Sequence, residues 1–161
     1  MFSLELGTWH GYLITRRIKP PVINFKTQQL KENKMSIFSH VGVGSNDRTK
    51  STKFYDAALG ALNVKNLGEM GEMATLYGID KPAFAVFTPT DGNPATAANG
   101  GTVGFNAANR DAVHKFHEAG ILAGGTCDGE PGPRAFTPTA YAAYLRDPDG
   151  NKICAYCFAD E

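Results

Sequence analysis

The sequence predicts an α+β fold in which two βαβββ repeats form a concave mixed sheet with the helices outside. Three observations support this fold class. Strand-like and helix-like patterns alternate from Met35 onward, and the pattern restarts after 62 positions. The composition, with 42% hydrophobic and 20% charged residues in a chain of 161, is typical of one globular domain.

Charge and glycine content divide the chain near Met35. Residues 1–34 carry six basic and two acidic side chains, whereas residues 35–161 carry ten basic and fourteen acidic ones. Sixteen of the eighteen glycines follow Met35. We therefore predict that residues 1–34 are an extension, either disordered or upstream of the natural start, and that residues 35–161 form the domain.

The composition also excludes several classes of protein. The longest apolar run is far shorter than a membrane span, so we expect no membrane insertion. The net charge of zero argues against nucleic-acid binding. Three cysteines without a disulfide framework are typical of a reducing compartment, so we expect a cytoplasmic protein.

The first half, about residues 35–98, begins with an alternating strand pattern. Asn46 or Asp47 can cap a helix that starts near Arg48, in which apolar residues recur at helical spacing. The expected strands are 37–44, 64–69, 73–79 and 83–88, and a polar loop covers 90–101.

The second half, about residues 99–161, repeats the first at an offset of 62. Identical residues occupy six positions of a 19-residue window that starts at His40 and Thr102. The second helix is expected over 110–119, with Gly120 as its C-terminal cap. Further strands are expected at 140–145 and 152–158, joined by the turn 147–151.

Three motifs in these halves resemble the vicinal-oxygen-chelate superfamily of glyoxalase I, bleomycin-resistance proteins and extradiol dioxygenases. They are SHVGV at residues 39–43, KFYD at 53–56 and LRDPDGNK at 145–152. The chain is most similar to small glyoxalase-like proteins. The resemblance implies a homodimer and a divalent metal (zinc, nickel, iron or manganese) that chelates adjacent substrate oxygens in the concave sheet.

The resemblance also indicates which positions would hold that metal. His40 matches a ligand position of the first strand, but Thr102 stands at its counterpart in the second half, and Cys154 replaces a glutamate. The fourth position lies near Phe84 or Ala85. This ligand set is degenerate, and a site without metal is an equal alternative.

The same residues also allow other chemistry. Cys154 and His40 could form a thiolate–imidazole pair, although a buried, inert cysteine is the simpler interpretation. Residues that could line a ligand pocket are aromatic: Tyr77, Phe84, Tyr144 and Tyr156. His114 and His117 form an H-x-x-H pair that could bind a metal weakly, but the simpler interpretation is an exposed helix face.

Two functional hypotheses follow. The first is a glyoxalase-like, lactoylglutathione lyase-related protein that acts on or binds a small metabolite in a concave pocket, with metal-dependent lyase, isomerase or dioxygenase-like chemistry if it is an enzyme. The second is a protein of the bleomycin-resistance type that sequesters a small planar or aromatic compound without catalysis. Stoichiometric metal that is lost in His40→Ala would favour the first hypothesis.

Overall fold

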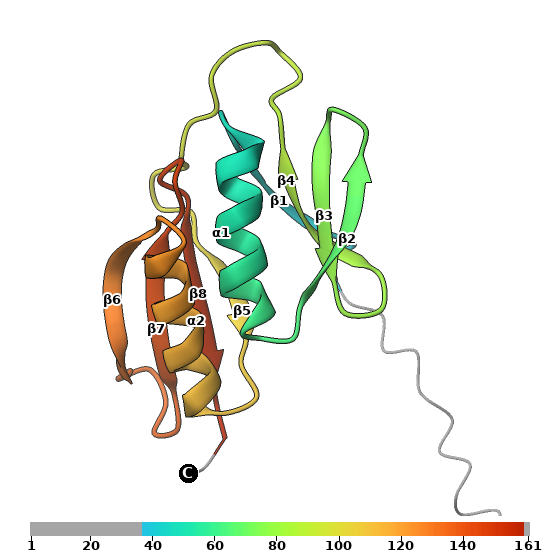
Figure 1. Ribbon diagram of the computed structural model, residues 1–161. Helices are drawn as coiled ribbons and strands as arrows, with labels where there is room; N and C mark the ends of the chain where they lie inside the picture. The colour runs from blue at the N-terminus through green and yellow to red at the C-terminus, as the bar shows by residue number, and fades with distance from the viewer. Residues whose placement is uncertain (1–36, 160–161) are drawn as a thin grey trace, which may run out of the picture. The chain divides into compact units, whose positions relative to one another are not determined.

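The computed structural model describes residues 37–159, so the predicted extension 1–34 lies outside the described residues. Two βαβββ units follow one another, which confirms the predicted fold class (Figure 1). The first unit contains β1 (Val41–Gly44), α1 (Arg48–Gly60), β2 (Lys65–Met70), β3 (Ala74–Gly78) and β4 (Pro82–Phe87). The second contains β5 (Val103–Asn106), α2 (Arg110–Leu122), β6 (Thr126–Pro133), β7 (Tyr141–Arg146) and β8 (Lys152–Cys157).

Each unit forms its own four-stranded mixed sheet. The strand orders are β1-β4-β3-β2 and β5-β8-β7-β6, and in both sheets the first strand of the unit runs parallel to the last. The registers also correspond, because Gly42 pairs with Ala85 and Gly104 pairs with Cys154. Ala85 and Cys154 are therefore equivalent positions of the two halves.

The two helices begin in the same way. The side chain of Asp47 accepts a hydrogen bond from the Lys50 backbone N–H at 3.1 Å, and Asn109 accepts one from Ala112 at 2.8 Å. These caps satisfy donors that a helix start leaves unpaired. Asp47, rather than Asn46, is the first cap, and Asp47 and Asn109 stand 62 positions apart, as the repeat predicts.

The prediction that Gly120 ends the second helix is wrong. α2 continues to Leu122, and Gly120 lies inside it, buried. A Cβ atom at Gly120 would stand 2.3 Å from Leu145 Cδ1 and 3.2 Å from a ring carbon of Phe54. Gly120 therefore serves close packing of α2 against its neighbours, not a turn in the backbone.

Two strand predictions also need correction. The first strand starts at Val41 instead of Ile37, because residues 37–40 are exposed and pair with no strand. The strand β6 was not predicted at all. Its sequence, TCDGEPGP, contains two glycines and two prolines, and its pairing with β7 is interrupted by register shifts, so it shows no alternating pattern.

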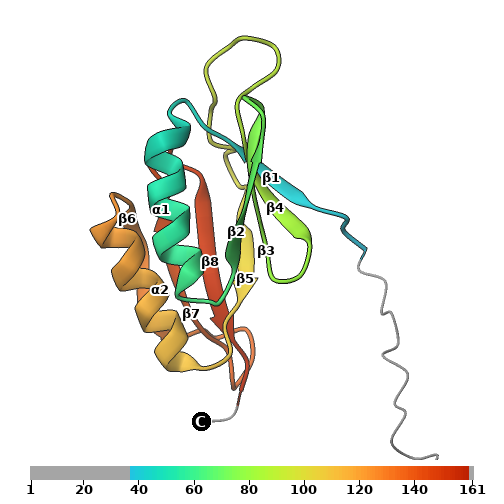
Figure 2. The same ribbon diagram turned by 45° about the vertical axis from the view of Figure 1, so that its right-hand side comes forward.

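The helices and the sheets enclose one core. In both views α1 lies beside α2, and α2 covers the second sheet (Figures 1 and 2). Buried side chains of both halves contribute: Phe54, Tyr55, Ala58, Leu59, Leu62, Tyr77, Phe84, Val86, Val113, Phe116, Ala143, Leu145, Ile153, Ala155 and Cys157. Since side chains alternate along a strand, their neighbours on each sheet point to the opposite side, here called the open face.

The turn between β7 and β8 joins the two halves. Asp147 is buried and accepts hydrogen bonds from the Tyr55 hydroxyl at 2.7 Å and from the Asn151 side chain at 2.9 Å. Asn151 also donates to the carbonyl oxygen of Gly44, and Asp149 accepts from the backbone and side chain of Asn46. The DPDGN part of the third motif is thus a structural clamp.

No helix within residues 37–159 is both long and apolar enough to cross a membrane.

Candidate functional site

The predicted metal-ligand positions lie at the starts of β1 and β5 and on β4 and β8. His40 and Thr102 are exposed and precede β1 and β5, respectively. The Nδ1 atom of His40 lies 3.0 Å from the Ser39 hydroxyl oxygen. Because Ala85, not Phe84, is the counterpart of Cys154, the fourth position offers no ligand atom.

Cys154 is buried on the open face of the second sheet. Its side chain is 3% exposed, and burial raises the pKa of the thiol to about 11, although the nearby charges of Lys152 and Arg134 lower it in part. The thiol is therefore protonated near neutral pH, and only the thiolate is a good nucleophile or metal ligand.

Tyr77 and Phe84 lie on the helix side of the first sheet. The Tyr77 hydroxyl donates to Asp56 Oδ1 at 3.1 Å, and burial raises the pKa of Tyr77, with Asp56 adding to the effect. Both rings border a pocket of about 340 Å³ that is lined by residues of both halves, among them Val41, Ile79, Val103 and Phe105.

Tyr144 and Tyr156 lie on the open face of the second sheet. Their neighbours along the strands, Ala143 and Ala155, belong to the core, so the two tyrosines point away from the helices. Their hydroxyls are hydrogen-bonded to each other and their rings meet edge to face. This hydrogen bond, together with burial, raises the pKa of Tyr156 to about 12. The four predicted pocket residues therefore form two pairs on opposite sides of the sheets.

Further aromatic rings extend the surface around Tyr156. The ring of Phe158 stacks on Tyr156 with centroids 5.4 Å apart and an angle of 14° between the planes. Phe136, which is 70% exposed, approaches Tyr156 edge to face at 6.0 Å. Neither ring is among the predicted pocket residues. Phe136 lies in a loop without a periodic pattern, whereas Phe158 could have been found, because it lies two residues after Tyr156 at the end of the predicted strand 152–158.

Two basic side chains flank the same rings. The Arg134 guanidinium lies 5.3 Å from the centre of the Tyr144 ring, and Lys152 Nζ lies 4.8 Å from it. Lys152 is neutralised by Asp128 at 2.8 Å, whereas Arg134 donates only to the backbone carbonyls of Glu130 and Pro133 within the described chain. We call this surface the aromatic–cationic face; it consists of Arg134, Phe136, Tyr144, Lys152, Cys154, Tyr156 and Phe158.

The open face of the first sheet has a different character. His40 borders a hollow of about 250 Å³ whose other walls are mostly apolar, among them Met70, Leu76, Ala85 and Phe87. His40 and the aromatic–cationic face thus belong to different sheets.

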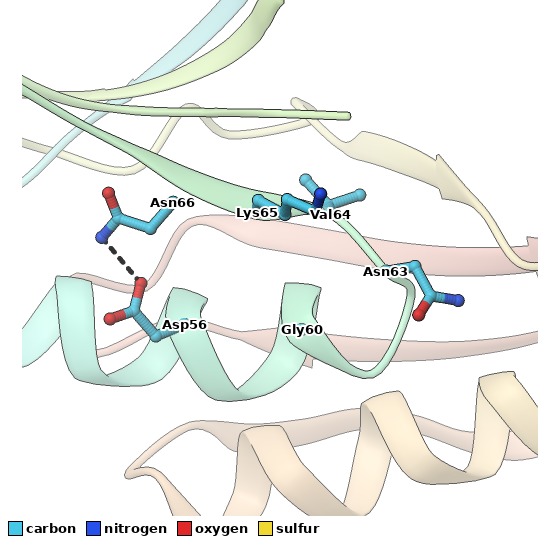
Figure 3. Close-up of a pocket in the computed structure, with 6 residues that line it drawn as sticks. All are labelled: Asp56, Gly60, Asn63, Val64, Lys65 and Asn66. Carbon is cyan, nitrogen blue, oxygen red and sulfur yellow. Dashed lines mark hydrogen bonds between the residues drawn. The ribbon is translucent and has the colours of Figure 1, made fainter. Parts of the chain in front are cut away.

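A further pocket, of about 390 Å³, lies at the C-terminal end of α1 (Figure 3). Its main polar contact is internal, because the Asn66 side chain donates to Asp56 Oδ1 at 2.9 Å. Asn63, which has a φ of 60°, turns the chain from the helix toward β2. The residues that line this pocket therefore form the connection from α1 to β2, and their polar groups bond to each other.

Comparison with known proteins agrees with this architecture. Residues 37–155 match the family model of the Glyoxalase/Bleomycin resistance protein/Dioxygenase superfamily. The chain belongs to this superfamily. Among solved structures, a glyoxalase/bleomycin resistance protein from Albidiferax ferrireducens T118 is 49% identical, with a TM-score of 0.66 over 75% of this chain and 98% of that one.

More distant superfamily members share the fold. A glyoxalase/bleomycin resistance protein/dioxygenase family enzyme from Burkholderia phytofirmans PsJN is 17% identical, with a TM-score of 0.59 over 75% of this chain and 98% of that one. A glyoxalase I mutant from Zea mays is 26% identical, with a TM-score of 0.51 over 73% of this chain and 44% of that one. A search of curated proteins finds no match.

The metal that the superfamily implies does not fit the residues at the expected positions. A divalent metal site needs several ligand atoms that converge, and catalytic sites usually have three protein ligands. Among the described residues, no group of three or more histidine, cysteine or acidic side chains includes His40 or Cys154. Thr102 offers only a hydroxyl, Ala85 offers no donor atom, and Cys154 is the one thiol among the four positions.

Proposed function

We propose that this superfamily member binds a small, planar, anionic molecule on the aromatic–cationic face, without a metal at the position that the superfamily uses. The observation that carries the proposal is the pairing of exposed aromatic rings with an arginine that has no carboxylate partner in residues 37–159. Aromatic side chains stack against planar groups, and a guanidinium matches the geometry of a carboxylate or phosphate.

The positions of the charges support an anionic ligand. Asp128 forms ion pairs with Lys152, at 2.8 Å, and with Arg146, at 3.4 Å. The pKa of Asp128 is lowered, first by the hydrogen bond from Lys152, so the carboxylate stays charged at neutral pH and keeps these cations paired. Arg134 is the cation of this face that is left for a ligand.

Isothermal titration calorimetry tests the proposal with two probes of equal shape, naphthalene-2-carboxylate and naphthalene-2-carboxamide. We expect the carboxylate to bind at least about tenfold more tightly, since only the anion forms an ion pair and can accept two parallel hydrogen bonds from the guanidinium. Arg134→Gln should abolish this preference, and Tyr156→Ala should weaken both probes. Arg48→Gln is the matched control, because Arg48 pairs with Glu69 near the other sheet.

Equal binding of the two probes, or binding that Arg134→Gln and Tyr156→Ala leave unchanged, would refute the proposal. A metal-dependent lyase or isomerase activity that disappears in His40→Ala would support the enzymatic hypothesis instead.

We also propose that the protein is a cytoplasmic homodimer. The free thiols of Cys127, Cys154 and Cys157 support a reducing compartment. The edge strand β2 is exposed along its whole length, which leaves its backbone groups available for pairing with a second chain. Sedimentation equilibrium of the full chain tests the dimer, and a monomer at micromolar concentration would exclude it.

A further inference from the structure

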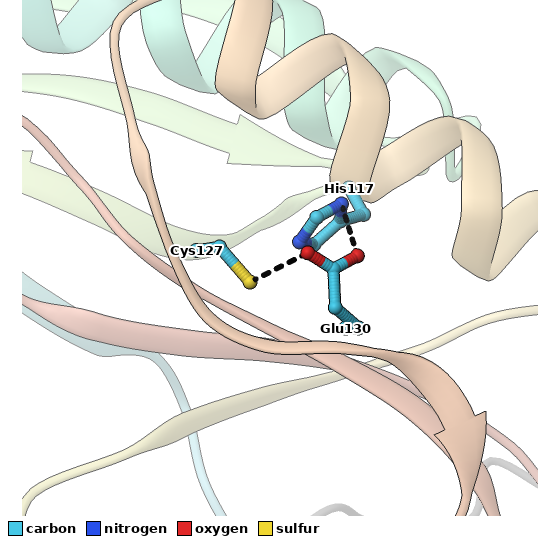
Figure 4. Close-up of side chains that lie close together, drawn as sticks. All are labelled: His117, Cys127 and Glu130. Atoms are coloured by element: carbon cyan, nitrogen blue, oxygen red, sulfur yellow. Dashed lines mark hydrogen bonds and ion pairs between the residues drawn. The ribbon is translucent and has the colours of Figure 1, made fainter.

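A second cluster of chemically active side chains lies on the helix side of the second sheet, away from the aromatic–cationic face. His117 comes from α2, and Cys127 and Glu130 come from β6 (Figure 4). One potential ligand atom of each residue lies within 4.8 Å of those of the other two. Within the part of the chain that the structure describes, this is the one such group of three.

The irregularity of β6 brings two of these residues together. Residues three apart on a regular strand point to opposite faces of the sheet, so Cys127 and Glu130 should diverge. The pairing with β7 shifts register between Cys127 and Gly129 and again between Gly129 and Gly132. These bulges turn both side chains toward α2, where the Cys127 thiol lies 3.4 Å from Glu130 Oε1.

His117 is the buried member of the cluster and lacks ordinary partners. It is only 8% exposed, which contradicts the expectation that the H-x-x-H pair lies on an exposed helix face. Its Nε2 atom is buried without a hydrogen-bond partner, and Nδ1 lies 3.9 Å from Glu130 Oε2, beyond hydrogen-bond range. His114, by contrast, is exposed and bonds to the Tyr141 hydroxyl at 2.7 Å. A buried polar atom without a partner is costly. Neither ring nitrogen of His117 lies within hydrogen-bond range of a partner in the described residues, so the imidazole is available to bind a cation.

We propose that His117, Cys127 and Glu130 bind a zinc ion. A nitrogen, a sulfur and a carboxylate oxygen form a borderline-soft ligand set, which suits zinc and disfavours magnesium and calcium. Around a tetrahedral zinc these atoms stand roughly 3.3–3.8 Å apart, given typical bond lengths. The Cys127 thiol lies 3.4 Å from Glu130 Oε1, the other carboxylate oxygen lies 3.9 Å from His117 Nδ1, and one ligand atom of each residue lies within 4.8 Å of those of the other two. The exposed side chains of Cys127 and Glu130 can rotate to bring three ligand atoms into the tetrahedral range.

Three protein ligands leave a fourth position open to water or to an added ligand. The site would also link α2 to the edge strand β6, whose Glu130 carbonyl holds Arg134 at 2.7 Å. The proposed zinc site is separate from the position of His40. Loss of zinc from this site can therefore be distinguished from loss of a metal at His40.

In the first experiment, the full chain is treated with a chelator and then titrated with zinc chloride, and calorimetry measures the binding. We expect one zinc per chain, with affinity at least about tenfold lower in Cys127→Ala and in Glu130→Gln. Both substitutions are on exposed side chains and should not impair folding. Glu118→Gln, an exposed neighbour on α2 with the same change of charge, and His40→Ala are controls that should retain full binding.

Two further readouts identify the ligands. Cobalt substituted for zinc should show a thiolate-to-metal charge-transfer band that Cys127→Ser abolishes. Zinc should also protect Cys127 from thiol reagents, which is measurable because the other two cysteines of the chain are buried. Absence of stoichiometric zinc binding, or binding that survives Cys127→Ala and Glu130→Gln or disappears in His40→Ala, would overturn the proposal.

Discussion

The two halves have the same backbone plan but opposite chemistry on their open faces. In the first half that face is lined by Leu76, Ala85 and Phe87, with His40 at its margin. In the second half it carries Tyr144, Tyr156 and their basic neighbours. The parallel pairs β1–β4 and β5–β8 have the same register, so at Ala85 and Cys154 the halves differ in the side chain and not in the backbone pairing. The same backbone plan therefore presents a mostly apolar open face in one half and an aromatic–cationic one in the other.

The halves also differ in the turn that joins their last two strands, and substitutions in these turns should have the largest effects on stability. Asp147→Ala should lower the free energy of unfolding by about 2–5 kcal/mol, because it leaves Tyr55 and Asn151 without their buried acceptor. Asp80→Ala, in the corresponding exposed turn of the first half, should change it little. Urea denaturation measures both, and equal effects would show that the turns play the same role.

The next prediction compares one glycine of each helix. Gly120→Ala should destabilise the protein by about 1–3 kcal/mol, because the new Cβ atom would overlap Leu145. Gly60→Ala, near the end of α1, meets open space and should be neutral or stabilising by up to about 1 kcal/mol. Thermal and urea unfolding of the two variants provide the measurement, and a stable Gly120→Ala variant would contradict the packing described above.

The clamp between the halves should also make stability depend on pH. Burial alone would raise the pKa of Asp149, but hydrogen bonds from Asn46, Ser45 and Ser51 outweigh it, so the pKa in the folded state is lowered. The unfolded chain then binds more protons in acid, and this contribution to stability is present above about pH 4 and is lost as pH falls through the folded-state pKa.

Unfolding curves between pH 2 and 6 test this contribution. Asp149→Asn should show a shallower loss of stability in acid than the unmodified protein, whereas the exposed control Asp80→Asn should follow the unmodified protein. Parallel pH profiles for Asp149→Asn and the unmodified protein would mean that the clamp does not depend on the charge of Asp149.

The smallest expected effect concerns Cys154, which occupies the position in the second half that Ala85 occupies in the first. With a pKa of about 11, only roughly one Cys154 thiol in a thousand is ionised at pH 8, and the side chain is buried. Iodoacetamide should therefore label Cys127 and spare Cys154 in the folded protein. Rapid labelling of Cys154, detected by peptide mass spectrometry, would restore a nucleophilic role for it.

Local signals predicted most of the regular structure. A helix cap at Asn46 or Asp47 and the offset of 62 residues were readable, because capping and helical periodicity act within a few residues. The structure selects Asp47 and places Asn109 at the equivalent cap. The strand β6 was missed for the opposite reason: its bulges, glycines and prolines remove the alternation by which a strand is recognised. The same bulges bring Cys127 beside Glu130, so the zinc cluster was hidden together with the strand.

The sequence by itself determined the fold class, the repeat and the family, since these depend on periodicity and on motifs that are contiguous in the chain. It also showed that the expected metal positions are occupied by Thr102 and Cys154. Only the tertiary structure decided which side of a sheet each side chain faces and what stands opposite it. Tyr77 and Tyr144 looked alike in the sequence, but one is held in the core by Asp56 and the other lies on the open face. Such a distinction depends on strand register, which is set by pairing between segments that are far apart in the chain.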